Sequence, residues 1–152
     1  MALDTTLFDS DLTFWGWSCT TPNELFARLA DELEVRDLVA PTWRGAVATR
    51  EEVYPTGLAT ASCGIALPHA DAEHIIRPFI ALVRPASPIP FEPMGGIGDT
   101  VDAELVMALG FTHAEDQIGA LQHVMEVFAN ERTGEALRAA TSPAELIALL
   151  RG

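Results

Sequence analysis

The stretch Gly64-Ile-Ala-Leu-Pro-His-Ala-Asp-Ala-Glu73 carries most of the structural and chemical information in this sequence. Its apolar start predicts a strand over residues 64–67, which leads into Pro68 and then directly into His69. Proline fixes its own φ and biases the preceding residue towards an extended conformation, so we expect His69 at a stiff exit from a sheet. An imidazole is largely neutral and nucleophilic near neutral pH. A histidine held this way suits phosphoryl transfer or metal ligation better than core packing.

The composition is that of one globular domain, residues 1–152, with 49% hydrophobic residues and a mean hydropathy of +0.20. No apolar stretch reaches the roughly 18 residues that a membrane-spanning helix needs, so we expect no direct membrane insertion. The first residues lack the basic region of a secretory signal. The two cysteines, Cys19 and Cys63, have no short spacing, which argues against a disulfide scaffold. These features predict a cytoplasmic protein.

The charge balance is strongly acidic, with a formal net charge of −13. All nine basic residues are arginines. Such a chain lacks the basic surface that binds nucleic acid or anionic lipid, and it favours partners with basic faces. Any cationic contact to a phosphate must therefore come from arginine or from backbone N–H groups.

Helical and strand patterns interleave along the chain, which predicts an α/β sandwich. Capping boxes at Thr21-Pro22-Asn23-Glu24 and Ser142-Pro143-Ala144-Glu145 begin the first and last helices. The other expected helices run from Pro41 to Glu52, from Glu115 to Asn130, and from Asn130 to Leu137. The expected strands are residues 13–17, 64–67, 79–83, 89–91 and 103–111, and residues 92–100 form a polar, glycine-rich loop. The long helix is expected to bury one face made of Ile118, Leu121, Val124, Met125 and Phe128.

Four side chains are candidates for one phosphoryl-transfer site. His69 is the nucleophile, Arg50 ends the second helix, Thr56 lies in the turn after it, and Gln117 stands in the first turn of the long helix. Phosphoryl transfer needs an in-line nucleophile and compensation of the charge on the equatorial oxygens. Arginine supplies a bidentate fork and threonine one further donor. A nearby arginine also disfavours the imidazolium form and keeps the histidine nucleophilic.

The segments Arg50-Glu-Glu-Val-Tyr-Pro-Thr-Gly57 and Gly64-Ile-Ala-Leu-Pro-His69 together resemble the active-site region of enzyme IIA components of the sugar phosphotransferase system, in the fructose/mannitol-type class. The resemblance runs through essentially the whole chain. It implies a single domain with a central mixed β-sheet flanked by α-helices. Many members carry a second histidine where Gln117 stands here. The chain resembles the galactitol-type subgroup in three features, which are glutamine at that position, the sequence Tyr-Pro-Thr-Gly and His74.

The resemblance also implies a mechanism and partners. His69 would accept a phosphoryl group, on Nε2, from phospho-HPr and pass it to a cysteine of enzyme IIB, which serves a membrane enzyme IIC. Arg50, Thr56 and Gln117 would line the pocket, with Glu51 and His74 as supporting residues and no cofactor. We expect both partners to dock on an apolar rim built from Leu67, Ile65 and the loop 95–98. The alternative function within this family is a phosphorylation-dependent regulatory switch that is not coupled to sugar uptake.

Other functional assignments stay open on the sequence alone. His69, Asp71 and His74 have a loose spacing that a zinc-dependent hydrolase could use, although no fourth ligand is evident. Cys63 invites a thiol-nucleophile assignment, but a small half-buried residue is the better prediction. His113 and His123 are expected to lie away from the site, with His123 exposed.

Overall fold

Strand β6, Val101–Gly110, is the centre of the fold in the computed structural model, which describes residues 3–152. It pairs antiparallel with β4 (Phe79–Pro85) on one side and parallel with β3 (Gly64–Ala66) on the other. β1 (Phe8–Trp17) runs parallel to β4, β2 (Gly57–Ala59) runs antiparallel to β3, and β5 (Ile89–Phe91) pairs with the first residues of β6. The sheet order is β1-β4-β6-β3-β2, so the predicted mixed sheet is confirmed.

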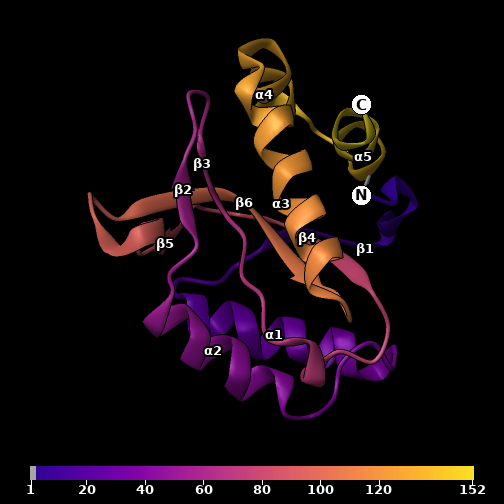
Figure 1. Ribbon diagram of the computed structural model, residues 1–152. Coiled ribbons are helices and arrows are strands. Elements are labelled where there is room, and N and C mark those ends of the chain that lie inside the picture. Colours follow the sequence, from indigo (N-terminus) through magenta and orange to yellow (C-terminus); the bar gives the residue numbers. More distant parts are fainter. Residues whose placement is uncertain (1–2) are drawn as a thin grey trace.

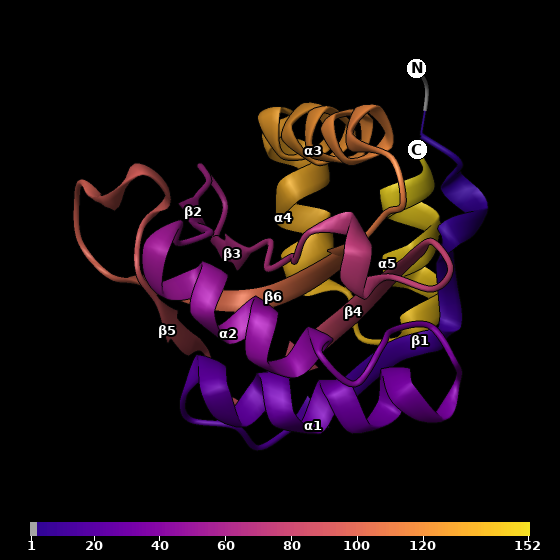
Figure 2. The same ribbon diagram turned by 60° about the horizontal axis from the view of Figure 1, so that its bottom comes forward.

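Helices cover both faces of this sheet (Figures 1 and 2). One face packs against α1 (Pro22–Val35) and α2 (Trp43–Val53), and the other against α3 (Ala114–Ala129), α4 (Glu131–Ala139) and α5 (Pro143–Arg151). Three short 3₁₀ turns, Thr5–Leu7, Ala72–His74 and Met94–Gly96, complete the structure. The predicted α/β sandwich is therefore confirmed.

Strand β4 shows why both faces are covered. Phe79, Ala81 and Val83 pack into the core under α1 and α2, whereas Ile80 and Leu82 pack under α3, α4 and α5. Successive side chains of a strand point to opposite faces, so a continuous apolar run demands a helical layer on each side. Removal of this apolar surface from water is the main stabilising term. Within residues 3–152, no helix combines the length and the apolar character that crossing a bilayer requires.

The predicted helix starts are confirmed at three caps. The side chains of Thr21, Asn130 and Ser142 accept hydrogen bonds from backbone N–H groups in the first turns of α1, α4 and α5. The second helix begins at Trp43, not at Pro41, because Pro41 and Thr42 form a turn before it.

Two strands differ from the prediction. β1 begins at Phe8, five residues earlier than expected, and β2 was not predicted. The predicted face of α3 is wrong for Ile118 and Met125, which are 55% and 47% exposed. Both side chains are therefore largely exposed, whereas Val124 and Phe128 are buried as expected.

Candidate functional site

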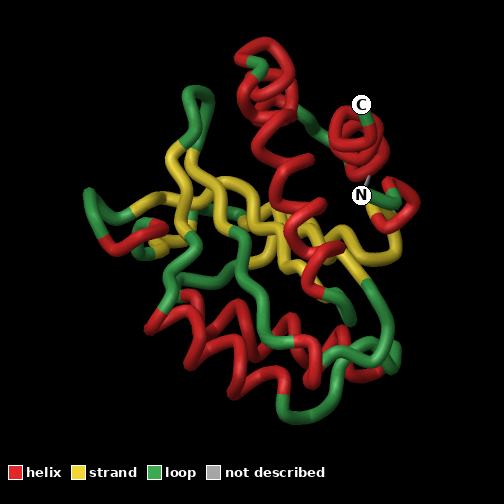
Figure 3. Tube along the Cα trace, viewed as in Figure 1, coloured by secondary structure: helices red, strands yellow, loops and turns green. Residues whose placement is uncertain are grey.

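His69 leaves the sheet along a fixed path. The chain continues past the end of β3 beside β6, where the Leu109 N–H donates a hydrogen bond to the Pro68 carbonyl over 3.0 Å. His69 itself pairs alongside Leu109. Figure 3 shows the segment after β3 as a loop that passes between the α2 and α3 layers. The predicted stiff exit from the sheet is confirmed, with Leu67 and Pro68 both buried.

The ring of His69 is oriented by its own backbone. Its Nδ1 lies 2.9 Å from the Leu67 carbonyl oxygen. A carbonyl only accepts, so Nδ1 carries the proton in the neutral ring and Nε2 keeps its lone pair. This contact leaves Nε2 as the ring nitrogen with a free lone pair.

The surroundings of His69 favour the neutral form. Burial lowers the pKa of His69 below its ordinary value of 6.5, and the positive charge of Arg50 lowers it further. The hydrogen bond to Leu67 and the charge of Asp71 act in the opposite direction. Because the lowering causes prevail, the ring is uncharged near neutral pH and available as a nucleophile.

His69 lines a cavity of about 320 Å³ between the two helical layers. Arg50 of α2 forms part of one wall, and the start of α3 forms another with His113, Gln117 and Ile118. Phe111, the residue after β6, also lines the cavity. The structure therefore brings His69, Arg50 and Gln117 together, although they are far apart in the sequence.

Arg50 reaches the cavity from the last turn of α2. Its Nη1 donates a hydrogen bond to Asp71 Oδ1 over 2.9 Å, and its guanidinium carbon lies 5.4 Å from the centre of the Tyr54 ring. Its Nε is buried and has no hydrogen-bond partner among residues 3–152. Arg50 therefore has unused donors beside the histidine, which fits recognition of an anion.

Thr56 and Glu51 lie beneath the site. Thr56 is only 3% exposed, and its N–H and hydroxyl both donate to the Glu51 carboxylate, over 2.6 and 2.8 Å. The Thr56 hydroxyl also accepts from the Leu67 N–H over 3.2 Å. Burial raises the pKa of Glu51, and the hydrogen bonds from Thr56 oppose that shift. Thr56 therefore supports the strand exit from below and does not line the cavity, in contrast to the expectation from sequence.

Two contacts explain why the Tyr54-Pro-Thr-Gly57 segment ends in glycine. The Gly57 N–H donates to the Glu92 carbonyl over 3.0 Å. A Cβ at Gly57 would lie 2.6 Å from that same oxygen, so this position accepts only glycine without a shift of the backbone.

His113 was expected to lie away from the site, and that prediction is wrong. It is the N-cap residue of α3, and it lines the same cavity as His69. The signal was present in the sequence, because His113 precedes Gln117 by four residues, one helical turn on the same face. The side chain of His113 makes no capping hydrogen bond to the helix.

The expected docking rim is also wrong in its residues. Leu67 and Ile65 are fully buried in the core under α3, and residues 95–98 do not line the cavity of His69. The exposed apolar side chain at the cavity is instead Ile118, which is 55% exposed. Tyr54, which is 64% exposed, packs on Arg50 in the neighbouring groove.

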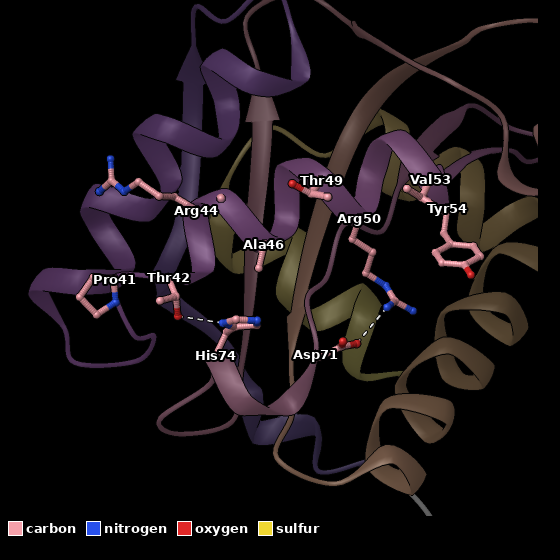
Figure 4. Close-up of a pocket in the computed structure, with 11 residues that line it drawn as sticks. Pro41, Thr42, Arg44, Ala46, Thr49, Arg50, Val53, Tyr54, Asp71 and His74 are labelled. Atoms are coloured by element: carbon pink, nitrogen blue, oxygen red, sulfur yellow. Dashed lines mark hydrogen bonds and ion pairs between the residues drawn. The ribbon is translucent and has the colours of Figure 1, made fainter.

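The alternative sites do not assemble. His74 points into a separate groove, where its Nδ1 lies 2.8 Å from the Thr42 hydroxyl (Figure 4). Over residues 3–152, no three histidine, cysteine or acidic side chains gather as metal ligands, so the His69, Asp71 and His74 set is not formed. Burial raises the pKa of the half-buried Cys63 thiol, which disfavours a thiolate nucleophile. His123 is half-buried, not exposed, and its Nε2 contacts the Leu150 carbonyl over 2.6 Å.

Comparison with known proteins agrees with this geometry. Residues 6–152 match the family described as phosphoenolpyruvate-dependent sugar phosphotransferase system, EIIA 2. The galactitol-specific EIIA component of the phosphotransferase system of Escherichia coli K12 is 30% identical over 107 residues, 70% of this chain and 71% of that protein. Two solved structures share the fold at lower identity. One is enzyme IIA of the mannitol system of Escherichia coli, in complex with phosphorylated enzyme IIB, with a TM-score of 0.74 and 22% identity over 93% of this chain and 95% of that chain. The other is the nitrogen regulatory protein IIA-Ntr of Neisseria meningitidis, with a TM-score of 0.75 and 17% identity over 96% of this chain and 97% of that chain.

The fold and the family match define an EIIA-type component of the sugar phosphotransferase system. The chain belongs to its EIIA 2 family, and the predicted similarity to galactitol-specific members is confirmed.

Proposed function

We propose that this chain is a cytoplasmic phosphocarrier that accepts a phosphoryl group on His69 Nε2 from phospho-HPr and passes it to a cysteine of a galactitol-type enzyme IIB. The observation that carries the proposal is the contact of His69 Nδ1 with the Leu67 carbonyl. It leaves Nε2 as the free nitrogen of a ring whose pKa is lowered and which lines an open cavity. No cofactor is needed for this reaction.

The bond changes balance without any proton carrier on this chain. In the first step, the N–P bond of phospho-HPr breaks as the Nε2 lone pair of His69 forms a new N–P bond. In the second step, that bond breaks as the cysteine thiolate of enzyme IIB forms an S–P bond. Arg50 compensates charge on the equatorial oxygens in both steps, and Gln117 orients the ring or donates to an oxygen.

The test is phosphorylation of the purified chain by phosphoenolpyruvate, enzyme I and HPr, followed by intact-mass analysis. We expect a gain of one acid-labile phosphoryl group, and its loss on addition of a galactitol-type enzyme IIB. No gain with a competent HPr would overturn the proposal. Phosphorylation without transfer to enzyme IIB would favour the regulatory alternative, which uses the same chemistry.

Replacement of Arg50 by alanine is expected to slow phosphoryl acceptance by about 10- to 100-fold, the effect of losing one charge-stabilising donor of about 1.4–2.7 kcal/mol. Arg50→Lys should recover part of the rate, because lysine keeps the charge but not the fork. Rapid-quench kinetics with phospho-HPr measures the effect. The matched control is Arg44→Ala, since Arg44 lies on the same helix but pairs with Asp31 and Glu34 and does not line the cavity. Equal slowing in both variants would contradict the assignment of Arg50.

The pH dependence of the free protein has a definite sign. Because folding lowers the pKa of His69, the neutral ring contributes stability that is present above 6.5 and is lost as the pH falls through the lowered pKa. We expect an NMR titration of the His69 ring to show a midpoint below 6.5 in the wild type. The midpoint should move upward in Arg50→Ala, which removes one lowering charge. A wild-type midpoint above 6.5 would refute this prediction.

A further inference from the structure

Arg50 stands at the boundary between two hollows of the surface. One is the cavity of His69, and the other is a groove of about 770 Å³ along α2. Arg50 and Asp71 line both hollows, and Figure 4 draws them in the groove. The figure shows the Arg50 guanidinium turned towards Asp71, with Tyr54 on its other side. The position of this guanidinium therefore decides how much positive charge faces His69.

Asp71 is the hydrogen-bond acceptor that holds Arg50 in this position. A guanidinium has five N–H donors, and the Nη1–Asp71 contact of 2.9 Å uses one of them. Nε is buried and unpartnered among the described residues. Arg50 thus keeps donors that are not used by Asp71, and an anion in the cavity could accept from them.

Another anion can replace Asp71 as the partner of Arg50. The side chains of Arg50 and Asp71 are 34% and 68% exposed, so water screens their attraction. A phosphoryl group carries about −1.5 to −2 charges near neutral pH and three strong acceptor oxygens. On His69 Nε2 it would offer Arg50 a stronger partner than the single carboxylate.

We propose that Asp71 is a positioning residue, which holds Arg50 at the edge of the cavity while His69 is free and yields it to the phosphoryl group on Nε2. The inference rests on the proposed function of His69. Since the phosphoryl group competes with Asp71 for the charge and the donors of one guanidinium, Asp71 weakens the hold of this chain on the group. Asp71 thereby sets how readily the phosphoryl group moves on to the next carrier.

The test compares Asp71→Asn with the wild type in the equilibrium between phospho-HPr and this chain. The asparagine keeps the size of the side chain and removes its charge. We expect the equilibrium to shift towards the phosphorylated chain by about two- to fivefold, the range of a partly exposed ion pair. The matched control is Glu73→Gln, an acid in the same loop that contacts His74 and does not line the cavity, which should leave the equilibrium unchanged. Equal equilibria in Asp71→Asn and the wild type overturn the inference.

Two further measurements test how Asp71 acts on the phosphoryl group and on His69. In an Arg50→Ala background the shift caused by Asp71→Asn should disappear, because the two residues act as one unit. A shift of the same size in that background would mean direct repulsion of the phosphoryl group by Asp71, and would overturn the positioning role. In the unphosphorylated protein, Asp71→Asn should lower the pKa of His69, since the Asp71 charge raises it. Arg50 and His113, the other basic side chains that line the cavity, are kept in this variant, and an NMR titration of the His69 ring measures the shift. An unchanged pKa of His69 would show that the charge of Asp71 does not act at His69, and would count against the inference.

The failure of this inference is distinguishable from failure of the proposed function. If the wild type takes up no phosphoryl group at all, the proposed function fails and the inference fails with it. If the wild type is phosphorylated and Asp71→Asn behaves as the wild type does, only the inference fails.

Discussion

Replacing His69 with alanine is expected to abolish phosphorylation of this chain while leaving it folded. No other side chain of the cavity combines a fixed path, a lowered pKa and a free ring nitrogen. The fold should persist because His69 is only half-buried and lies outside both apolar cores. The lost hydrogen bond to the Leu67 carbonyl should lower the free energy of unfolding by about 0.5–1.5 kcal/mol. Intact-mass analysis and urea denaturation measure the two effects.

The matched control for this variant is His113→Ala. His113 is the other imidazole of the cavity, but it is exposed and sits at the N-cap of α3. We expect His113→Ala to keep phosphorylation, with at most a change in rate. Phosphorylation of His69→Ala, and its absence from His113→Ala, would move the acceptor role to His113. Equal unfolding of both variants would show that the two histidines are structural.

The regular elements of this fold could be predicted because their signals are local. The caps at Thr21 and Ser142 are set by side chains within four residues of the helix start. Strand β4 begins with a continuous apolar run over residues 79–83, which Arg84 and Pro85 end. β2 could not be predicted, because its three residues are held mainly by pairing with β3 and carry little pattern of their own. The first half of β1 was missed because Asp9, Ser10 and Asp11 are exposed at the edge of the sheet.

The candidate site also has residues that could be predicted from the sequence and residues that could not. His69 and Arg50 could be singled out from sequence because a proline-histidine strand exit and an arginine at a helix end are short, local patterns. The role of Asp71 could not, because its contact with Arg50 joins residues 21 positions apart and depends on where the loop after β3 crosses α2. The direction of the Thr56 hydroxyl, downward to Glu51, likewise follows from tertiary packing.

The half-buried carboxylate of Glu51 is expected to be the most sensitive polar group of the fold. It accepts from both the N–H and the hydroxyl of Thr56, and that hydroxyl in turn accepts from the Leu67 N–H. Glu51→Ala leaves two donors of Thr56 without a partner in a buried place. Since each unsatisfied group costs about 1–3 kcal/mol, we expect the two to lower the free energy of unfolding by roughly 2–6 kcal/mol. Urea denaturation at neutral pH measures it.

The same substitution should also reduce function, because the Leu67 backbone is the support of the acceptor histidine. The Leu67 N–H is held by Thr56 and the Leu67 carbonyl holds His69 Nδ1, so a displaced Leu67 turns the ring. We expect Glu51→Ala to accept phosphoryl groups more slowly even under conditions where it is fully folded. Glu52→Ala is the matched control, since Glu52 is the exposed neighbour on the same helix and should change neither quantity. A folded Glu51→Ala with the wild-type rate would show that the chain from Glu51 through Thr56 to Leu67 stabilises the fold without positioning His69.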